Sequence, residues 1–432
     1  MNYGGGKSDA SNRWKWFILI SCLGTKFLNI GLRKSFGVLL TTLHSQLDIP
    51  IWILGLVVSI SVSGGDIIGP VVGGFATLCG CRPVVIIGGI LLSVGMILAS
   101  FSRSFLQLVI FLCGFCGLGF GLTNDPPFAV LGQYFHEHFS LANSFAMAGS
   151  SLGIMLLGPL TQIFVEIYGW RGAMWLLGAL VFHITVFGAL LRPPTRTDNL
   201  DHFLLQEDEI EGTNIEDGNS DNSCSDCCSS LVRTMDSSLF KDPMFIIIIL
   251  VSTTIRFSQM AWLIYLVPNV VSKGVPILQA SFISTSAGVG DLIGRLLPGV
   301  FSSVSGREIS SKTVWTFGMC ITAVSFALDA MVEPYSGMMV LGFFQGLGIG
   351  MTYSSTNVVL FDEFGKERLV NSMGWVRGIS GFGRIIGGFV PGFIYRTTHS
   401  YRWSYVVLGV IQALGILILN IGQVCFPSKT TT

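Results

Sequence analysis

The stretch Gly117-Leu-Gly-Phe-Gly-Leu-Thr123 recurs later in the chain as Gly346-Leu-Gly-Ile-Gly-Met-Thr352. Three further short stretches recur in the same order: Gly65–Gly69 with Gly290–Gly294, Leu141–Ser144 with Leu369–Ser372, and Tyr168–Trp170 with Tyr401–Trp403. Chance could supply one such match, but four in register predict a parallel internal repeat. Secondary transporters use repeats of this kind to build a central site between two bundles.

About twelve apolar segments contain or adjoin these stretches. A helix needs ~20 mostly apolar residues to cross a bilayer. Half of the 432 residues are hydrophobic and only 12% are charged, which predicts an integral membrane protein. The formal net charge of zero gives a nucleic-acid partner no electrostatic support. The predicted spans are 15–42, 51–77, 83–101, 105–134, 140–166, 171–191, 244–270, 277–303, 312–330, 335–361, 368–394 and 402–425.

A polar, acidic stretch separates the sixth predicted span from the seventh. Its low hydrophobicity and like charges predict a disordered linker. Lys and Arg are more frequent on one side of the predicted spans, which places both termini and the linker in the cytoplasm. The expected divisions are a tail at 1–14, a six-helix bundle at 15–192, the linker at 193–243, a second six-helix bundle at 244–426 and a tail at 427–432.

Charged residues inside the predicted spans are candidates for function, because a charge at the bilayer centre costs roughly 2.5–3.5 kcal/mol on insertion scales. Asp291 and Arg295 are four residues apart, so they share a helix face and can pair. Positive candidates outnumber negative ones, which indicates a wet cavity or an anionic cargo. The positive candidates are Lys26, Arg33, Lys34, Arg295, Arg377 and Arg384, and the negative ones are Asp66, Asp125 and Asp291.

Several of these charges have simpler interpretations. Lys26 and Arg33 could extend toward the interface or face solvent. Asp291 and Arg295 could form a structural clip between helices. Arg377 and Arg384 are about two turns apart on one face, where packing against backbone carbonyls competes with cargo contact.

The sequence Asn124-Asp125-Pro126-Pro127 interrupts the fourth predicted span. The two prolines remove backbone donors, and a broken helix at membrane depth is tolerated where it lines a cavity. Asn124 is therefore a candidate for substrate binding. A plain kink is the competing interpretation.

A set of short motifs runs through nearly the whole chain. They are Trp14–Trp16 with Arg33–Val38, Gly80–Gly89, Leu141–Asn143, Gly169–Ala173, Ile264–Pro268, and the pair Asp291 and Arg295. As a set they resemble the monocarboxylate transporter family of the major facilitator superfamily. The resemblance implies an all-α membrane protein with the major facilitator fold, twelve transmembrane helices in two six-helix pseudo-repeat bundles.

Three departures indicate a divergent member, whose cargo need not be lactate or pyruvate. Asn12-Arg13 replaces the acidic opening of the first signature, and Glu137-His138 replaces the paired arginines of the fifth-span signature. The eleventh span ends at Tyr395–His399 without the usual acidic residue.

The resemblance implies roles for the intramembrane charges. Arg295 would hold a carboxylate and Asp291 would take up the coupled proton, with Lys34 as a first station for both. Asp66, Asp125, Arg377 and Arg384 are secondary candidates. The implied function is secondary active transport of a small monocarboxylate by alternating access, coupled to protons, in the plasma membrane. A single-span immunoglobulin-type chaperone glycoprotein is a candidate partner.

Other classes of function stay open at this point. Some family members carry a neutral or zwitterionic solute, such as an amino acid or a creatine-like compound, by facilitated diffusion. A non-transporting receptor with the same architecture is a further alternative. No nucleophile is clustered with a base in the sequence, so we do not expect an enzyme, and we expect no cofactor and no metal site.

Overall fold

The computed structural model describes residues 5–47, 51–135, 138–192, 237–304, 310–398 and 400–425. Within these ranges every regular element is a helix, which confirms the predicted all-α class. Most of the predicted linker, residues 193–236, lies outside the described residues.

Both halves of the chain consist of long helices joined by short connections. The N-terminal half contains α1 (Gly5–Leu47), α2 (Ile51–Ile67), α3 (Gly69–Cys79), α4 (Cys81–Ser100), α5 (Phe105–Val109), the π-helix η1 (Ile110–Cys116), α6 (Gly117–Asn124), α7 (Pro126–Tyr134), α8 (Phe139–Val181) and α9 (His183–Leu190). The C-terminal half contains the short 3-10 helix η2 (Ser237–Lys241), α12 (Pro243–Ser272), α13 (Ile277–Val304), α14 (Ser311–Asp329), α15 (Tyr335–Thr398) and α16 (Arg402–Cys425). Each of the twelve predicted segments falls on one or more of these helices.

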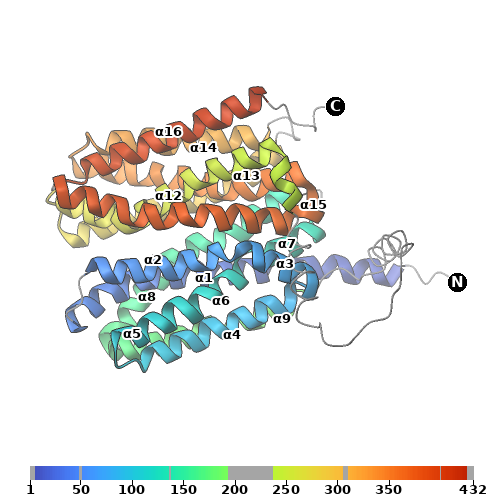
Figure 1. Cartoon of the computed structure of the whole chain (residues 1–432), viewed down its shortest axis with the longest axis horizontal. Coiled ribbons are helices and arrows are strands. Elements are labelled where there is room, and N and C mark those ends of the chain that lie inside the picture. Colours follow the sequence, from blue (N-terminus) through green and yellow to red (C-terminus); the bar gives the residue numbers. More distant parts are fainter. Residues whose placement is uncertain are drawn as a thin grey trace, which may run out of the picture.

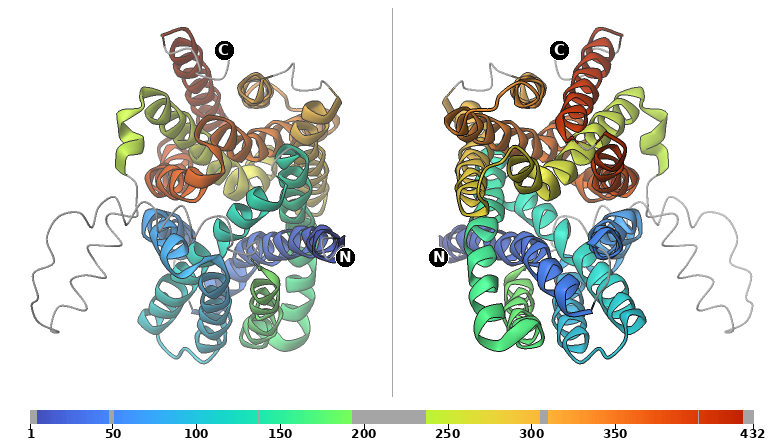
Figure 2. Two further views of the ribbon diagram at one scale, coloured as in Figure 1. Left: turned by 90° about the vertical axis from the view of Figure 1, so that its right-hand side faces the viewer. Right: turned by 90° about the vertical axis from the view of Figure 1, so that its left-hand side faces the viewer.

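The two halves form two bundles that lie against one another along their length (Figure 1). A view along the helices shows the N-terminal bundle, in blue to green, beside the C-terminal bundle, in yellow to red (Figure 2). The start of α1 and the end of α16 lie at the same end of the molecule, which we call the terminal end (Figure 1).

Two glycines with non-helical dihedral angles turn the chain between consecutive predicted spans, so that α8 and α15 each consist of two helices joined at a kink. Gly169 has φ 67° inside α8, and Gly365 has φ 71° inside α15. Residues with a Cβ avoid this left-handed region, whereas glycine adopts it readily. The fifth and sixth predicted spans therefore both lie on α8, with α9 completing the sixth, and the tenth and eleventh lie on α15.

The fourth predicted span is kinked rather than unwound. The helix ends at Asn124 and restarts at Pro126, but Asp125 between them keeps helical dihedral angles, φ −102° and ψ −38°. The prolines occupy the first turn of α7, where a missing N–H costs little. Of the two interpretations of this sequence, the structure supports the kink.

Six helices or helix pairs are long and apolar enough to cross a bilayer in the described part of the chain, and α2 with α3 would make a seventh as one span bent by 44°. The surface agrees with this. Large apolar side chains such as Leu106, Phe389 and Ile421 are more than half exposed, while many charged side chains are buried. Outward apolar and inward polar side chains are what a lipid surrounding requires.

Several of the repeated glycines lie where two helices of one half come into backbone contact. A Cβ on Gly346 of α15 would lie 1.9 Å from the carbonyl oxygen of Ala287 on α13. In the other half, a Cβ on Gly121 of α6 would lie 2.5 Å from the carbonyl oxygen of Gly65 on α2. Small residues let transmembrane helices pack backbone to backbone. The sequence repeat therefore corresponds to a helix crossing that occurs in both halves. This crossing fixes the positions of Asp66, which follows Gly65, and of Asp291, which follows Gly290.

Hydrogen bonds and a ring contact join the halves near the terminal end. The Asn143 side-chain amide donates to the carbonyl oxygen of Ser354 at 3.0 Å, and the Asn357 amide donates to Asn143 Oδ1 at 3.0 Å. The rings of Phe139 and Phe361 stack with their centroids 4.3 Å apart. Phe139 begins α8 directly after α7, whose end lies toward the terminal end (Figure 1). The bundles are therefore held together on this side.

Candidate functional site

Asp291 and Arg295 form a buried pair on α13 that also reaches the other half. Arg295 Nε donates to Asp291 Oδ2 at 2.8 Å and to Ser151 Oγ at 3.1 Å. Ser151, on α8, donates its hydroxyl to the same Asp291 oxygen at 2.5 Å. The side chains of the pair are only 1–2% exposed. The predicted pairing on one face is present, and it lies at the contact between the bundles.

Each member of this pair keeps a polar atom unused. Asp291 Oδ1 and Arg295 Nη1 are buried and find no hydrogen-bond partner among the described residues. The Arg295 guanidinium lies over the Tyr353 ring, 5.4 Å from its centroid. The Tyr353 ring and Asp291 thus fix the position of the guanidinium, while Nη1 remains free to donate a hydrogen bond to a bound ligand.

A cavity between the halves joins Asp291 of this pair to the predicted lysine. Lys34, on α1, is partly buried at its wall, and most of the other lining side chains are apolar. We call it the Lys34 cavity; its lining is Lys34, Ile154, Trp262, Leu263, Leu266, Val267, Ser284, Gly288 and Asp291. The structure therefore brings Lys34 and Asp291, the two predicted proton-coupling residues, to one cavity.

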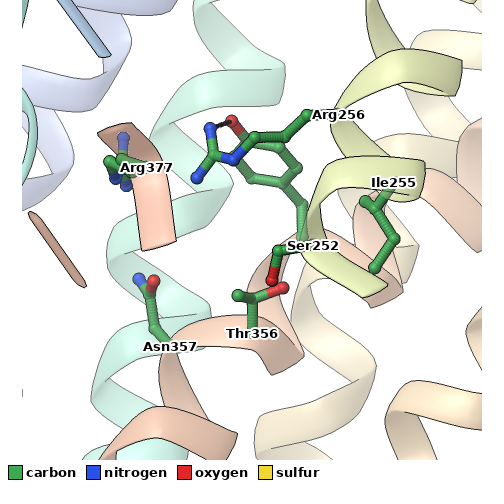
Figure 3. A pocket seen from close by; sticks show the side chains of 7 residues that line it. Ser252, Ile255, Arg256, Thr356, Asn357 and Arg377 are labelled. Atoms are coloured by element: carbon green, nitrogen blue, oxygen red, sulfur yellow. Dashed lines mark hydrogen bonds between the residues drawn. The ribbon is translucent and has the colours of Figure 1, made fainter. Parts of the chain in front are cut away.

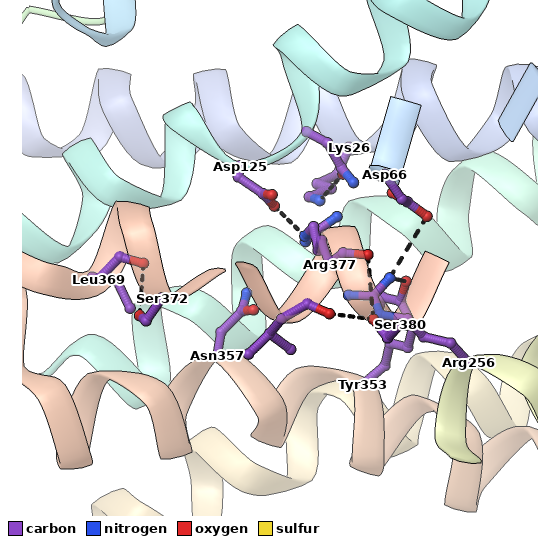
Figure 4. Close-up of polar contacts among 12 residues, drawn as sticks. Lys26, Asp66, Asp125, Arg256, Tyr353, Asn357, Leu369, Ser372, Arg377 and Ser380 are labelled. Atoms are coloured by element: carbon purple, nitrogen blue, oxygen red, sulfur yellow. Dashed lines mark hydrogen bonds and ion pairs between the residues drawn. The ribbon is translucent and has the colours of Figure 1, made fainter. Parts of the chain in front are cut away.

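A second buried charge cluster surrounds Asp66 of α2 (Figure 4). Arg384 of α15 forms an ion pair with Asp66 and donates to the Tyr353 hydroxyl at 2.6 Å. Arg256 of α12 donates to the same hydroxyl at 2.9 Å, and its Nη1 lies 3.8 Å from Asp66 Oδ2. Asp66 and Arg384, both secondary candidates, are thus paired across the two halves.

Of the remaining candidates, Arg377 and Asp125 meet across the halves, and Asn124 has a partner within the N-terminal half. Arg377 of α15 forms an ion pair with Asp125, at the kink between α6 and α7 (Figure 4). Asn124 accepts a hydrogen bond from Lys26 Nζ at 2.5 Å, and that ammonium lies 4.7 Å from the centroid of the Phe128 ring. In the structure Asn124 is a partner of a lysine rather than a group open to a cavity.

Lys26 and Arg33 do not face solvent, contrary to the simpler interpretation of their sequence positions. Lys26 is 2% exposed and Arg33 is 7% exposed. The Arg33 guanidinium lies 4.7 Å from the centroid of the Phe120 ring, and its Nε and Nη2 have no hydrogen-bond partner among the described residues. Both cations belong to the buried charge of the bundle interior.

The buried charge of the described residues is positive overall. Seven buried Lys and Arg side chains accompany four buried Asp side chains, which favours an anion as the missing partner. The cations are Lys26, Arg33, Arg256, Arg295, Lys312, Arg377 and Arg384, and the anions are Asp66, Asp125, Asp291 and Asp329.

A second, small cavity lies beside Arg256 (Figure 3). Most of the side chains around it are polar. We call it the Arg256 cavity; its lining is Ser252, Ile255, Arg256, Tyr353, Thr356, Asn357 and Arg377.

Three residues that contact the buried charges, Ser151, Arg256 and Tyr353, were missed by reasoning from the sequence. Arg256 is the only charged residue in the predicted span 244–270, so a signal was present. Ser151 and Tyr353 had no such signal, because neutral polar side chains are frequent in this chain. Their position opposite a charge depends on how the helices face one another.

Comparison with known proteins agrees with this architecture. The family model of the Major Facilitator Superfamily matches residues 22–302 and 244–429. The chain is 27% identical to monocarboxylate transporter 2 of Rattus norvegicus over 418 residues, covering 94% of this chain and 82% of that protein. It is 28% identical to monocarboxylate transporter 13 of Bos taurus over 421 residues, covering 97% of this chain and 92% of that protein. The resemblance seen in the motifs is confirmed, and the chain belongs to the Major Facilitator Superfamily as a divergent relative of the monocarboxylate transporters.

Proposed function

We propose that this transporter moves a small monocarboxylate across the membrane by alternating access, with the movement coupled to protons. The observation that carries the proposal is the buried Asp291–Arg295 pair, which keeps an unused acceptor and an unused donor and whose Asp291 lines the Lys34 cavity. The surplus of buried cations supports an anionic cargo. The names of its relatives support a carboxylate as that anion.

Arg295 is the proposed carboxylate ligand. A guanidinium presents parallel N–H donors that match the two oxygens of a carboxylate. Its Nη1 has no partner among the described residues, and stacking on Tyr353 limits how the group can turn. An incoming carboxylate would satisfy Nη1 and compete with Asp291 for the rest of the guanidinium.

Asp291 is the proposed proton carrier. While ionised, it neutralises Arg295 through the bond at 2.8 Å. Protonation removes the negative charge of Asp291, so the Arg295 guanidinium becomes available to the cargo carboxylate. The proton and the anion together add no net charge to the site. Ser151 contacts both groups from the other half, so a change in their pairing acts directly on the contact between the bundles.

Lys34 is proposed to be the first residue that binds the entering anion and proton. It lies on the wall of a cavity that also reaches Asp291, and its ammonium is the only charged group besides that carboxylate among the lining residues. An anion entering the cavity would meet Lys34 on the way to Arg295. In the orientation that the Lys and Arg distribution predicts, with the terminal end in the cytoplasm, this entry is from outside the cell.

The carboxylate assignment is tested by replacing Arg295 in purified protein reconstituted in liposomes. We expect Arg295→Gln to reduce the uptake of radiolabelled monocarboxylates by at least about tenfold, because a charge-assisted hydrogen bond contributes about 1.5–3 kcal/mol. Arg295→Lys keeps the charge without the planar fork and should retain part of the activity. Arg402→Gln, at the exposed start of α16, is the control. Unchanged uptake in Arg295→Gln would identify the pair as a structural clip.

The proton assignment is tested with Asp291→Asn. Acidifying the outer solution should stimulate uptake by the native protein and leave the variant unaffected, since the amide cannot take up a proton. An equal response in both proteins would exclude Asp291 as the coupling group. No response in the native protein, with transport of a neutral or zwitterionic solute, would establish facilitated diffusion instead. Absence of counterflow for every solute would point to a receptor.

A further inference from the structure

The Arg256 cavity contains buried donors that the protein itself does not satisfy. Arg256 Nε and Ser252 Oγ are both buried without a hydrogen-bond partner among the described residues. The two residues are 4% and 2% exposed. They are four positions apart on α12, so they project from one face of that helix toward the same cavity (Figure 3). Buried polar groups are normally paired, so these two indicate an absent acceptor.

The charges around the cavity point to an anionic acceptor. Three guanidiniums, those of Arg256, Arg377 and Arg384, share two carboxylates, those of Asp66 and Asp125. Arg377 pairs with Asp125 and Arg384 pairs with Asp66, whereas Arg256 lies at the longer distance of 3.8 Å from Asp66. One positive charge is therefore left without close compensation, and Arg256 carries it.

The neighbouring side chains suit a small carboxylate. On the wall opposite Arg256 (Figure 3), the Asn357 amide donates to Asn143 and keeps a second N–H for an anion, whereas the Thr356 hydroxyl already donates to the carbonyl oxygen of Thr352. A carboxylate can accept from the guanidinium and from the Ser252 hydroxyl at the same time. In this structure the free space in the cavity is small, so a small organic acid would enter it only after the helices around it have moved apart.

The position of the cavity distinguishes it from the Lys34 cavity. Ser252 and Arg256 lie on the first half of α12, whereas Trp262–Val267 of the Lys34 cavity lie further along it. At 1.5 Å per residue, the two groups are roughly 10–20 Å apart along the helix. Tyr353 lies between the two cationic sites, since its ring is 5.4 Å from the Arg295 guanidinium and 5.3 Å from that of Arg256.

We propose that the Arg256 cavity is a second carboxylate-binding site, which receives the cargo anion from Arg295 on the way to the terminal end. This role in the transport path rests on the function proposed above. The capacity of the cavity to attract a carboxylate does not rest on it, so the two can be tested separately. In this structure the contacts of Phe139 with Phe361 close the terminal end, and the cavity is expected to open when they separate.

The test measures how fast a thiol placed in the cavity reacts with small reagents. Ser252→Cys is nearly isosteric and removes no hydrogen bond that the described residues make. The purified, reconstituted variant is treated with methyl methanethiosulfonate, which is neutral, or with its 2-carboxyethyl analogue, which carries a carboxylate. Mass spectrometry follows modification at position 252. The ratio of the two rates measures attraction of a carboxylate independently of access.

We expect this ratio to be about tenfold higher with Arg256 or with Arg256→Lys than with Arg256→Gln, because only the first two keep the charge. The ratio at the exposed native thiol of Cys425 should not change. An equal ratio in all three proteins, or no reaction with the neutral reagent, overturns the proposal. Loss of uptake in Arg295→Gln has no bearing on this ratio, so failure of one proposal is distinguishable from failure of the other.

Folding of the Arg256→Gln variant is checked in the same spectra, because the fully buried Cys116 reacts only if the bundle opens. If that variant unfolds, the proposal is tested instead by letting a carboxylate salt compete with the carboxylate reagent in the Ser252→Cys protein. Sodium acetate should slow modification by the carboxylate reagent, and sodium chloride at equal ionic strength should not. Equal rates in the two salts overturn the proposal.

Discussion

Asp66 and Asp291 occupy the same place in the two repeats but have different partners. Asp66 pairs with Arg384 of the opposite half. Asp291 pairs with Arg295 on its own helix and accepts from Ser151 of the opposite half. A pair between halves resists their separation, whereas a pair on one helix can exchange partners without moving that helix. We therefore assign Asp66 mainly to stability and Asp291 to transport.

Removing one partner of the Asp66–Arg384 pair should be strongly destabilising. Asp66→Ala leaves buried guanidiniums without a carboxylate, and breaking such a pair costs about 3–5 kcal/mol. Thermal unfolding in detergent should therefore occur at a clearly lower temperature. The double variant Asp66→Ala with Arg384→Met should recover part of the loss, because fewer unpaired charges remain buried.

The control for this comparison is Glu166→Gln, since Glu166 is exposed on α8. An Asp66→Ala protein that unfolds at the same temperature as the control would show that Arg384 has another partner. A double variant less stable than either single variant would show that the broken Asp66–Arg384 pair does not cause the loss of stability.

Helix crossings explain why the repeated stretches are rich in glycine. In the C-terminal half, a Cβ on Gly290 would lie 2.0 Å from the carbonyl oxygen of Phe343, and one on Gly350 would lie 2.3 Å from that of Asp291. These distances are too short for any side chain, so α13 and α15 touch through their backbones. The same contact holds Asp291 at a defined depth beside α15, where Tyr353 follows Gly350 by less than one turn.

Two adjacent glycines of α2 provide a matched test of this crossing. A Cβ on Gly65 would lie 2.6 Å from the carbonyl oxygen of Gly117, whereas a Cβ on Gly64 would meet nothing within 4 Å. Gly65→Ala should destabilise the protein by about 1–3 kcal/mol through overpacking. Gly64→Ala should be neutral or stabilising by up to about 1 kcal/mol, because alanine favours the helix. Thermal unfolding of the two variants measures the difference, and equal unfolding temperatures would contradict the backbone contact.

The arrangement of the two bundles fits one state of the alternating-access cycle that we propose. Contacts such as Asn143 with Ser354 and Phe139 with Phe361 join the halves near the terminal end. The Lys34 cavity lies further from that end, beside the second half of α12. For cargo to leave at the terminal end, these contacts must break as the bundles rotate.

A reversible link across this interface should therefore stop transport. Ser144 Oγ and Ser354 Oγ are 3.4 Å apart and belong to opposite halves, so cysteines at both positions are close enough for a disulfide. The double variant Ser144→Cys with Ser354→Cys should lose most carboxylate uptake after oxidation by copper phenanthroline and regain it after reduction. Each single cysteine variant, treated in the same way, controls for the native thiols. Full uptake by a protein shown to be cross-linked would exclude opening at the terminal end.

The sequence predicted much of the site because charge is rare in apolar spans. Asp291 with Arg295, Asp66, Asp125, Arg377 and Arg384 were all visible as isolated charges. The spacing predicted the pairing of Asp291 with Arg295 but not the pairs Asp66–Arg384 and Asp125–Arg377, because these join positions hundreds of residues apart in the chain. Asn124 was singled out for the break in its helix, yet it accepts from Lys26 in the structure.

The sequence by itself determined the class of the protein: its apolar segments, its repeat and its motifs indicate a two-bundle membrane transporter, because hydrophobic length and small-residue spacing are local properties of the chain. Only the tertiary structure decided which charges are paired and which donors are left open. It placed Ser151 and Tyr353 against Arg295, and it left Arg256 without close compensation beside a cavity. The physical reason is that pairing between buried groups depends on how helices from the two halves face one another, and such facing is set by packing across the interface rather than by spacing along one helix.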